Sequence, residues 1–406
     1  MLMLGTAQAL GTIVSQTSAP KNLGTTSTDW WPEFQHDPAN TGYSTSTAPS
    51  TAYVSWNYTT RNGGFSNPIV ADYKVFIGSI KEKEIICLDS RNGNLLWVYT
   101  KLSGPVYEYA SPIYAANKVY VATDSPNGAN EIVCLDAQNG SLVWKVACGP
   151  IEASLVFADG KIYACEWSHT HCFDANTGVK LWEATYPGNI RSTPGLADNR
   201  LYIASDAGTI YCLNASDGHS LWNFTTNGEP MDAPTIVDGK VFFASGTSTA
   251  GAVYCLDAVA GTLIWKNDGR AFNMVILSSP AVAYGKVYIG VKGEGNAFLR
   301  GGIFCLNEAT GTMMWRHRFS AIFDHGTFTS PAVADGKIFI EAQHLLYDRM
   351  LCLDANTGKT VWSFGQFGTN LYFSSPAIAN GHVYFGAQLS RLKGMVFCIG
   401  ASSDSS

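Results

Sequence analysis

The sequence predicts an all-β fold, an eight-bladed β-propeller of four-stranded antiparallel blades, on three observations. One unit repeats along the chain, each repeat has the pattern of four short strands, and the last repeat ends one strand short of completion. The unit recurs at intervals of roughly 40–50 residues, the spacing typical of propeller blades. The tryptophans that mark it are Trp56, Trp97, Trp144, Trp182, Trp222, Trp265, Trp315 and Trp362.

The repeat ending at Trp315 shows the four strands in order. Residues 279–283 are followed by a tight turn and by residues 286–290. A variable loop leads to residues 303–307, and a Gly-containing turn leads to residues 313–315. Val, Ile, Tyr and Phe fill these segments, as pleated packing prefers. Each repeat therefore predicts one antiparallel sheet, and no segment of helical period interrupts the series.

Two turns in each repeat have recognisable chemistry. The first is Asp-Gly at 159–160, 238–239 and 335–336, and Asn-Gly at 380–381, which favours two-residue hairpins with positive φ at both central positions. The second has Asp or Asn at its start and Gly near its end, as in Asp174-Ala175-Asn176-Thr177-Gly178. The Asx side chain can cap this turn while Gly adopts the left-handed conformation.

The ends of the chain predict how the ring closes. An eighth repeat runs from Ser375 to Cys398 and stops without its tryptophan, while the isolated segment 53–58 carries Trp56. Pairing the two completes the last blade and removes two exposed sheet edges. We expect residues 1–28 to be a leader or linker, with part of a signal segment as one interpretation. Residues 29–400 then form a single propeller, and residues 401–406 a flexible tail.

The repeated tryptophans are interpreted as structural. A side chain that occupies one fixed place in every blade cannot face a single ligand. Eight symmetric copies instead fill the wedge between neighbouring sheets, where each indole N–H can reach a backbone carbonyl. We therefore assign no catalytic role to them.

The cysteines follow the same repeat. Eight of the ten occupy one position, at Cys87, Cys134, Cys172, Cys212, Cys255, Cys305, Cys352 and Cys398. Spread around a ring, they lie beyond the roughly 7 Å between Cα atoms that a disulfide tolerates, so they are expected to be small buried hydrophobes. Cys148 and Cys165 remain. Cys165 can lie across a hairpin from Cys172, which leaves one local disulfide open.

The stretch Cys165–Cys172 also contains His169 and His171, which alternate along one face. A metal site is one interpretation, but the spacing matches no standard zinc pattern. The other interpretation is a solvent-exposed hairpin tip. We therefore assign no metal ligand here.

Composition excludes several classes of partner. The formal net charge is −6 and no run of Lys or Arg occurs, so nothing indicates binding to nucleic acid or an anionic membrane. No apolar run of about 18 residues is present, so no membrane span is expected. The apolar start followed by Ser and Thr, together with acceptor sequons at Asn57, Asn139, Asn214 and Asn223, favours export. An extracytoplasmic location (cell surface, periplasm or secreted) is predicted, with the cytoplasm as the alternative.

The repeats resemble the PQQ-like repeat family of eight-bladed propellers. Residues 352–362 (CLDANTGKTVW) and 330–340 (SPAVADGKIFI) look like its repeat, including the tryptophan-docking motif. Residues 30–44 (WWPEFQHDPANTGYS) are similar to the lead-in of exported members. WD-type propellers are disfavoured, because here the acid precedes the tryptophan by eight residues.

The resemblance implies two functional branches. Quinoprotein dehydrogenases of the family bind PQQ with Ca²⁺ in the central funnel. BamB-type members are non-enzymatic scaffolds that bind proteins. This chain has no Cys-Cys dipeptide, which many of the dehydrogenases stack on PQQ, and it lacks their long insertions. Both departures favour the second branch, with no cofactor expected and PQQ with calcium as the alternative.

Symmetry is broken at the mouth of the predicted funnel, where any ligand site is expected. The first ring of residues before the inner strands is Phe65, Tyr109, Glu152, Arg191, Met231, Leu277, Phe328 and Phe373. The second ring is Ser66, Ala110, Ala153, Ser192, Asp232, Ser278, Thr329 and Ser374. The candidate funnel residues for a cation or polar ligand are Glu108, Glu152, Arg191, Asp232, Asn273, Asp324 and His325. Glu152 and Arg191, from adjacent blades, can also simply pair with each other.

The function predicted from these observations is a non-enzymatic binding or assembly platform. It is expected to act as a monomer and to contact protein or glycan through its faces and variable loops, such as 125–131, 292–302 and 343–349. The alternative is a PQQ- and Ca²⁺-dependent dehydrogenase that oxidises an alcohol or a sugar.

Overall fold

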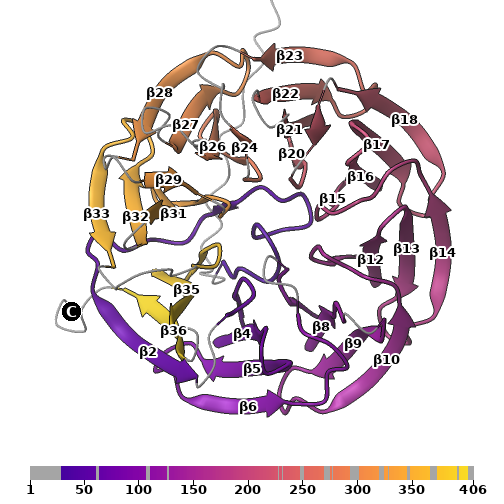
Figure 1. The fold of residues 1–406 in the computed structure, drawn as a ribbon, viewed down its shortest axis with the longest axis vertical. Coiled ribbons are helices and arrows are strands. Elements are labelled where there is room, and N and C mark those ends of the chain that lie inside the picture. Colours follow the sequence, from indigo (N-terminus) through magenta and orange to yellow (C-terminus); the bar gives the residue numbers. More distant parts are fainter. Residues whose placement is uncertain are drawn as a thin grey trace, which may run out of the picture.

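The computed structural model describes residues 29–60, 64–106, 110–125, 128–226, 228–230, 232–246, 251–268, 275–276, 278–292, 301–319, 324–327, 329–344, 348–365, 373–390 and 393–400. Within these ranges the chain is all β and forms eight sheets arranged as a ring (Figure 1). Both the all-β fold and the eight-bladed propeller are confirmed. Within these ranges no helix is long and apolar enough to cross a lipid bilayer.

The first four blades are regular and are traced in chain order from the centre to the rim. Blade 1 contains β3 (Ile69–Ala71), β4 (Lys74–Ser79), β5 (Glu84–Asp89) and β6 (Leu95–Tyr99). Blade 2 contains β7 (Ile113–Ala115), β8 (Lys118–Ala122), β9 (Asn130–Asp136) and β10 (Leu142–Cys148). Blade 3 contains β11 (Val156–Ala158), β12 (Lys161–Glu166), β13 (His169–Asp174) and β14 (Lys180–Thr185). Blade 4 contains β15 (Gly195–Ala197), β16 (Arg200–Ser205), β17 (Thr209–Asn214) and β18 (Ser220–Thr225).

The next three blades gain short extra strands, one each in blades 5 and 6 and two in blade 7. Blade 5 contains β20 (Thr235–Val237), β21 (Lys240–Gly246), β22 (Gly251–Asp257) and β23 (Leu263–Asn267), with β19 (Glu229–Pro230) paired to β21. Blade 6 contains β25 (Ala281–Ala283), β26 (Lys286–Lys292), β27 (Gly302–Asn307) and β28 (Met313–Arg318), with β24 (Val275–Ile276) paired to β26. Blade 7 contains β30 (Ala332–Ala334), β31 (Lys337–His344), β32 (Arg349–Asp354) and β33 (Thr360–Phe364), with β29 (Asp324–Gly326) paired to β31 and β1 (Tyr43–Ser44) parallel to β30.

Blade 8 is built from both ends of the chain. It contains β34 (Ala377–Ala379), β35 (His382–Ser390) and β36 (Lys393–Ile399), and its outer strand is β2 (Val54–Thr60). The strands β2 and β36 pair antiparallel, with Trp56 opposite Cys398. The other blades place a Cys opposite a Trp in the same way, as at Cys172 and Trp182. The eighth sheet therefore repeats the register of the others despite its composite origin.

The turns have the geometry that their residues favour. Asp159 and Gly160 have φ of 49° and 73°, and Asn380 and Gly381 have 50° and 76°, so both central residues are left-handed. In the second turn Asp174 accepts hydrogen bonds from the backbone N–H groups of Asn176 and Thr177, at 3.0 and 2.8 Å. The side chain thus closes the turn that leads to the outer strand.

The glycine that ends the second turn lies flat against the indole of the preceding blade. Gly178 has φ +73°, and a Cβ there would lie 2.7 Å from Cε3 of Trp144. Neither the conformation nor the contact leaves room for a side chain. The same contact joins Gly93 to Trp56, Gly140 to Trp97, Gly218 to Trp182, Gly261 to Trp222, Gly311 to Trp265 and Gly358 to Trp315.

Seven of the eight repeated indoles also donate a hydrogen bond to the next blade. Trp144 Nε1 donates to the carbonyl of Ala175 at 3.0 Å, and the hydroxyl of the fully buried Tyr120 donates to the same oxygen at 3.2 Å. The other indole N–H groups donate to Ser90, Ala137, Ala215, Ala258, Glu308, Ala355 and Pro49. An indole ring, a hydrogen bond and a glycine therefore join neighbouring blades at seven junctions, while Trp362 donates to Pro49, which precedes β2.

The cysteines are free thiols. All ten are unpaired, and nine are buried, with Cys148 partly exposed. Burial raises the pKa of the Cys134 and Cys305 thiols to about 12. The local disulfide left open above does not form, because the two-residue turn at 167–168 places Cys165 opposite Thr170 and Cys172 opposite Tyr163.

Residues 29–53, which we call the lead-in, cross the centre of the ring before β2 joins the rim (Figure 1). The middle residue of the inner strand donates its backbone N–H to the lead-in in blades 1 to 7. The pairs are Val70 to Trp31 O, Tyr114 to Pro32 O, Phe157 to Glu33 Oε2, Leu196 to Pro38 O, Ile236 to Ala39 O, Val282 to Thr41 O and Val333 to Gly42 O. Blade 8 is contacted at its first turn, where Gly381 N donates to Ser46 Oγ at 3.0 Å.

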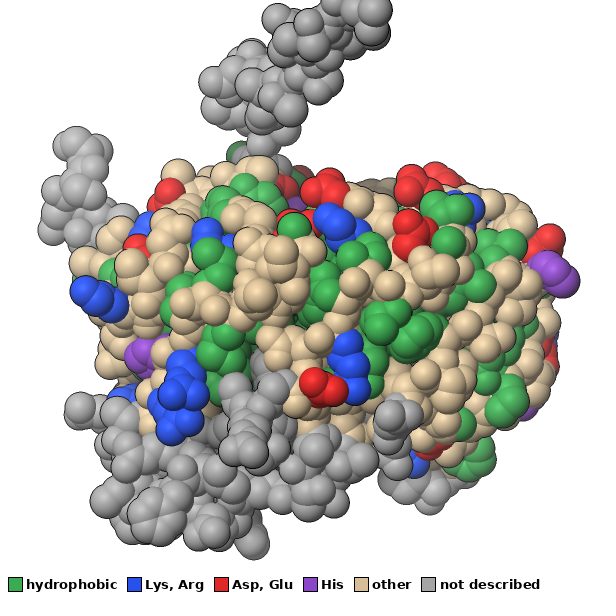
Figure 2. All heavy atoms as spheres, turned by 90° about the horizontal axis from the view of Figure 1, so that it is seen from above, with side chains coloured by type: hydrophobic (Ala, Val, Ile, Leu, Met, Phe, Trp, Pro, Cys, Tyr) green, Lys and Arg blue, Asp and Glu red, His purple; other side chains and the backbone are tan. Residues whose placement is uncertain are grey.

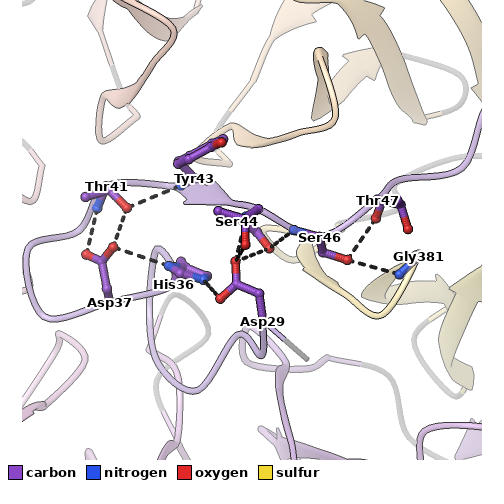
Figure 3. A network of polar contacts seen from close by, with 10 residues as sticks. Asp29, His36, Asp37, Thr41, Tyr43, Ser44, Ser46, Thr47 and Gly381 are labelled. Carbon is purple, nitrogen blue, oxygen red and sulfur yellow. Dashed lines mark hydrogen bonds and ion pairs between the residues drawn. The ribbon is translucent and has the colours of Figure 1, made fainter. Parts of the chain in front are cut away.

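A charged network holds the lead-in in this path (Figure 3). His36 Nε2 lies 3.0 Å from Asp29 Oδ1, and His36 Nδ1 lies 3.3 Å from Asp37 Oδ2. Burial lowers the pKa of His36, but hydrogen bonds and charges from the two carboxylates outweigh it and raise the pKa to about 9. Asp29 also accepts from Ser44 Oγ at 2.9 Å, which ties the two ends of the loop together.

The outer rim is mixed in character. Several outer strands expose two apolar side chains just before the tryptophan, each nearly half exposed, as at Leu95 and Leu96, Leu142 and Val143, and Leu263 and Ile264. Figure 2 shows apolar side chains scattered between polar and charged ones over the rim. The apolar core instead lies between the sheets, in clusters that each span neighbouring blades.

Candidate functional site

The two ends of the ring differ. The lead-in covers the end where first and second strands are joined, since it contacts turn residues Asp335 and Gly381. The opposite end, which we call the mouth face, carries the segments before the inner strands and the turns between second and third strands. The candidate funnel residues belong to the mouth face, so the site is described from there.

The described residues of the first predicted ring mostly make contacts within or between the blades and do not form an open ligand site. Phe65 and Phe373 are buried and form isolated bridges to Ser79 and Ala387. Glu152 and Arg191 lie at adjacent blades, with Arg191 Nε 3.9 Å from Glu152 Oε2. The Arg191 side chain is 62 % exposed, so this pair contributes little stability and its guanidinium remains accessible.

The second predicted ring is mainly structural. The hydroxyls of Ser66, Ser278, Thr329 and Ser374 accept hydrogen bonds from backbone N–H groups on the second strand of their own blade. The donors are Gly78, Gly290, Glu341 and Gly386, at 2.8, 2.7, 3.2 and 2.9 Å. These side chains fix the start of the inner strand against its neighbour. They are therefore not arranged around an open ligand site.

Asp232 occupies the same ring position in blade 5. Its Oδ2 is buried and has no hydrogen-bond partner. Burial alone raises the pKa of this carboxyl to about 7. An acid that is half protonated near neutral pH, at a position where other blades have Ser, Thr or Ala, is the strongest electrostatic irregularity of the predicted ring.

Two further acids at the mouth face were missed by the sequence analysis. Glu341, on β31, is 2 % exposed, and its Oε1 accepts from Phe373 N at 3.1 Å. Burial and the neighbouring charge of Asp348 raise the pKa of Glu341 well above its usual value. The signal was present, because Glu341 stands where blades 1, 6 and 8 have Gly78, Gly290 and Gly386.

Trp167 is the most exposed aromatic side chain among the residues described. It is 54 % exposed and sits in the turn between β12 and β13 with φ +42°. A left-handed backbone is uncommon for a bulky residue. Its carbonyl accepts from Ile190 N at 2.7 Å, which joins this turn to the segment that carries Arg191. Trp167 and Arg191 are thus presented by one hydrogen-bonded unit of the mouth face.

The histidine stretch beside this turn is a cluster of histidine and glutamate side chains, in which burial lowers the pKa of His171. His171 Nε2 lies 3.1 Å from Glu166 Oε2, and His171 Nδ1 lies 3.6 Å from Glu183 Oε2. His171 is buried, so the prediction of a solvent-exposed hairpin tip is right for Trp167 and wrong for His171. Among the described residues no group of three His, Cys, Asp or Glu side chains is placed to hold a metal ion.

The remaining candidates are not brought into a described site. Glu108 and Asn273 lie outside the described residues, as do Tyr109, Met231, Leu277 and Phe328 of the first ring. Asp324 and His325 are in β29, whose backbone pairs with β31 through Asp324 and His344. Of the candidates that the structure describes, Glu152 and Arg191 lie next to each other. Asp232 belongs to a different blade.

Comparison with known proteins identifies the family. The model described as "Outer membrane protein assembly factor BamB" (PQQ_2) matches residues 41–168, 168–300 and 299–395. No curated protein sequence matches the chain.

Solved structures share the fold at low identity. A europium-containing methanol dehydrogenase is 12 % identical with a TM-score of 0.72, and the match covers 92 % of this chain and 98 % of that one. The quinohemoprotein alcohol dehydrogenase ADHIIG from Pseudomonas putida HK5 is 13 % identical with a TM-score of 0.72, covering 93 % and 81 %. BamB from Moraxella catarrhalis is 15 % identical with a TM-score of 0.61, covering 84 % and 96 %.

These similarities include both an assembly factor and dehydrogenases, and at such identities they show the fold alone. The family model, in contrast, matches nearly the whole propeller. The chain therefore belongs to the PQQ-like repeat family whose model is described as outer membrane protein assembly factor BamB.

Proposed function

We propose that this protein is a non-enzymatic binding or assembly platform that works outside the cytoplasm and meets a protein or glycan partner through its mouth face. The observation that carries the proposal is Trp167, a half-exposed indole in a left-handed turn. Exposed aromatic residues and arginines dominate recognition surfaces because they bury large areas at little entropic cost. The accessible guanidinium of Arg191 lies on the segment bonded to that turn.

The lead-in supports the choice of face. It occupies the opposite end of the ring and bonds to seven inner strands through main-chain or carboxylate oxygens. The family's description as an assembly factor agrees with a protein partner. We expect the protein to act as a monomer, since one copy presents the complete mouth face.

The test compares Trp167→Ala with Val259→Ala. Val259 is 63 % exposed in the turn between β22 and β23, at the other end of the ring, so it controls for loss of an exposed apolar side chain. Cross-linking and co-purification from the native host would identify partners, and a glycan array would report sugars. Binding of the identified partner is expected to fall at least about tenfold in Trp167→Ala, or about 1.4 kcal/mol, and to stay unchanged in Val259→Ala. Equal binding of the partner by the wild type, Trp167→Ala and Val259→Ala would contradict the proposal.

The alternative function is a PQQ- and Ca²⁺-dependent dehydrogenase acting on an alcohol or a sugar. Similarity to two dehydrogenase structures favours it, as does the buried, unpartnered Oδ2 of Asp232 at the mouth face. The described residues do not fit the ion well, because Ca²⁺ takes six to eight oxygen ligands, and the hydroxyls of Ser278 and Thr329, at the same ring position in blades 6 and 7, already accept backbone hydrogen bonds. We derive no catalytic step from them.

Adding PQQ with Ca²⁺ to the purified protein separates the two functions. The platform predicts no change in PQQ absorbance and no titration heat. The dehydrogenase predicts both, with dye-linked oxidation that is lost in Asp232→Ala or Asp324→Ala.

A further inference from the structure

A ring of hydrogen bonds surrounds the propeller axis at the start of the inner strands. In most blades the backbone N–H donates to the side-chain oxygen at the equivalent position of the next blade. The pairs are Ser111 to Ser154, Ser154 to Thr193, Ala233 to Ser279, Ser279 to Ser330, Ser330 to Ser375, and Ser375 to Asn67, at 2.8, 3.1, 3.2, 3.1, 3.1 and 2.7 Å. Each oxygen in this ring thus receives one backbone donor.

The ring is interrupted at two junctions, between blades 4 and 5, where Ala233 has no side-chain oxygen, and between blades 1 and 2. There Asn67 N donates to the carbonyl of Ala110 at 3.1 Å instead of to the hydroxyl of Ser111. The side chain of Ser111 is 4 % exposed, and its Oγ has no hydrogen-bond partner. A buried hydroxyl without a partner costs roughly 1–3 kcal/mol, so its place next to a cavity is informative.

The lead-in supplies a second unpartnered group at the same place. Gln35 is 4 % exposed, and its Nε2 is buried with no hydrogen-bond partner. Gly42 packs against this amide, since a Cβ on Gly42 would lie 2.4 Å from Gln35 Oε1. The amide therefore lies buried beside the backbone of Gly42.

Gln35 and Ser111 line one cavity at the axis. Its other walls are Trp31, Phe34, Asn67, Pro68, Ser330, Ser375 and Pro376. The space suits about one water molecule, which needs only some 10–15 Å³ for its centre together with two to four polar partners. It is far too small for an organic cofactor, so it is distinct from any ligand site at the mouth face.

We propose that this cavity binds one water molecule, which accepts a hydrogen bond from Gln35 Nε2 and exchanges a second one with Ser111 Oγ. The hydroxyls of Ser330 and Ser375, which already accept backbone N–H groups, retain their own protons and can donate a third. The water then joins the lead-in to the ring where the ring is open. Cavities that stay dry in proteins are lined by apolar groups. This cavity is lined by two unpaired polar atoms, which would remain unpaired if it held no water.

The test combines crystallography with ¹⁷O magnetic relaxation dispersion, which counts long-lived internal waters. Wild-type crystals are expected to show one density peak within about 3.2 Å of both Gln35 Nε2 and Ser111 Oγ. The double variant Gln35→Met with Ser111→Ala is expected to lose that peak and one long-lived water. Ser79→Ala is the matched control, because Ser79 Oγ is also buried without a partner but does not line the cavity. It is expected to keep the water.

Two results would overturn the proposal of a bound water. A wild-type map with an empty cavity would do so, as would a relaxation signal unchanged in the double variant. Crystals soaked in bromide that give an anomalous peak in the cavity would identify an anion site instead. Each variant keeps its backbone donors, and circular dichroism would verify that it folds.

Discussion

The carboxyl of Asp232 illustrates how one residue can break an eightfold pattern. Its neighbours in the ring use hydroxyls to accept a backbone N–H from the second strand. Asp232 places a buried oxygen without a partner at the same position. Below its folded pKa of about 7 the group is neutral and tolerates burial; above it, an uncompensated charge is buried.

This predicts a pH-dependent stability. Because the pKa is raised on folding, the folded state binds the proton more tightly, so the free energy of unfolding falls as pH rises from about 4 to about 7. Asp232→Asn removes the charge and is expected to be more stable than the wild type above pH 7, on the order of 2 kcal/mol. Urea unfolding at pH 5 and pH 8 measures it. Asp159→Asn, in an exposed turn that Asn also suits, is the control, and an equal gain there would refute the assignment.

At the scale of the element, the turn from Asp174 to Gly178 explains why one sequence recurs in the chain. The Asp oxygen caps the turn, the carbonyl of Ala175 accepts from an indole, and Gly178 leaves space for that indole. Three residues of one blade therefore complete the packing of a tryptophan in the preceding blade.

Gly178→Ala should be far more costly than its backbone conformation implies. The left-handed φ costs about 1 kcal/mol for a non-glycine residue, and contact with Trp144 adds to it. We expect a total loss of roughly 2–4 kcal/mol in the free energy of unfolding. Gly160→Ala is the matched control, since its φ is also +73° but a Cβ there meets nothing within 4 Å. Losses of equal size in urea titrations would show that the indole contact is unimportant.

At the scale of the whole molecule, the lead-in connects all the blades, and the charge on His36 should govern how firmly it is held. The pKa of His36 is raised to about 9, so its contribution to stability is complete below about pH 6.5 and is lost as pH rises through about 9. The loss is at most about 3 kcal/mol. His36→Gln should remove this dependence.

Hydrogen exchange provides a local measurement of the same effect. The amides of Leu196 and Ile236, which donate to Pro38 and Ala39, should exchange faster at pH 9 than the intrinsic pH dependence allows, and should lose this excess in His36→Gln. His219→Gln, at an exposed position, should behave as the wild type does. The same excess in all three proteins would rule out His36 as its source.

The fold could be predicted because its determinants repeat. Turns such as Asp159-Gly160 and the tryptophan of each blade obey the same steric rules many times over, so a misreading of one repeat is corrected by the others. The composite eighth blade followed from the tryptophan missing after Cys398. Cys165 was less certain, yet counting back from a two-residue turn at 167–168 already places it opposite Thr170.

The site was less predictable because it depends on what does not repeat. Asp232 could be found by comparing blades, and Glu341 could have been found in the same way. The path of the lead-in could not, because Pro32, Pro38 and Ala39 bind the inner strands through carbonyl oxygens that any residue has. Exposure of Trp167 likewise depends on where its hairpin ends relative to the next blade.

The composite blade has a consequence for how the protein is made. On the ribosome, β2 emerges long before β36, the strand with which it pairs. The lead-in must likewise wait for inner strands that are synthesised over most of the remaining chain. Trp56 can meet its partners Ser90 and Gly93 as soon as blade 1 is made, but the main-chain groups of β2 stay unpaired until β36 is synthesised, which leaves a strand edge open to wrong pairing during translation.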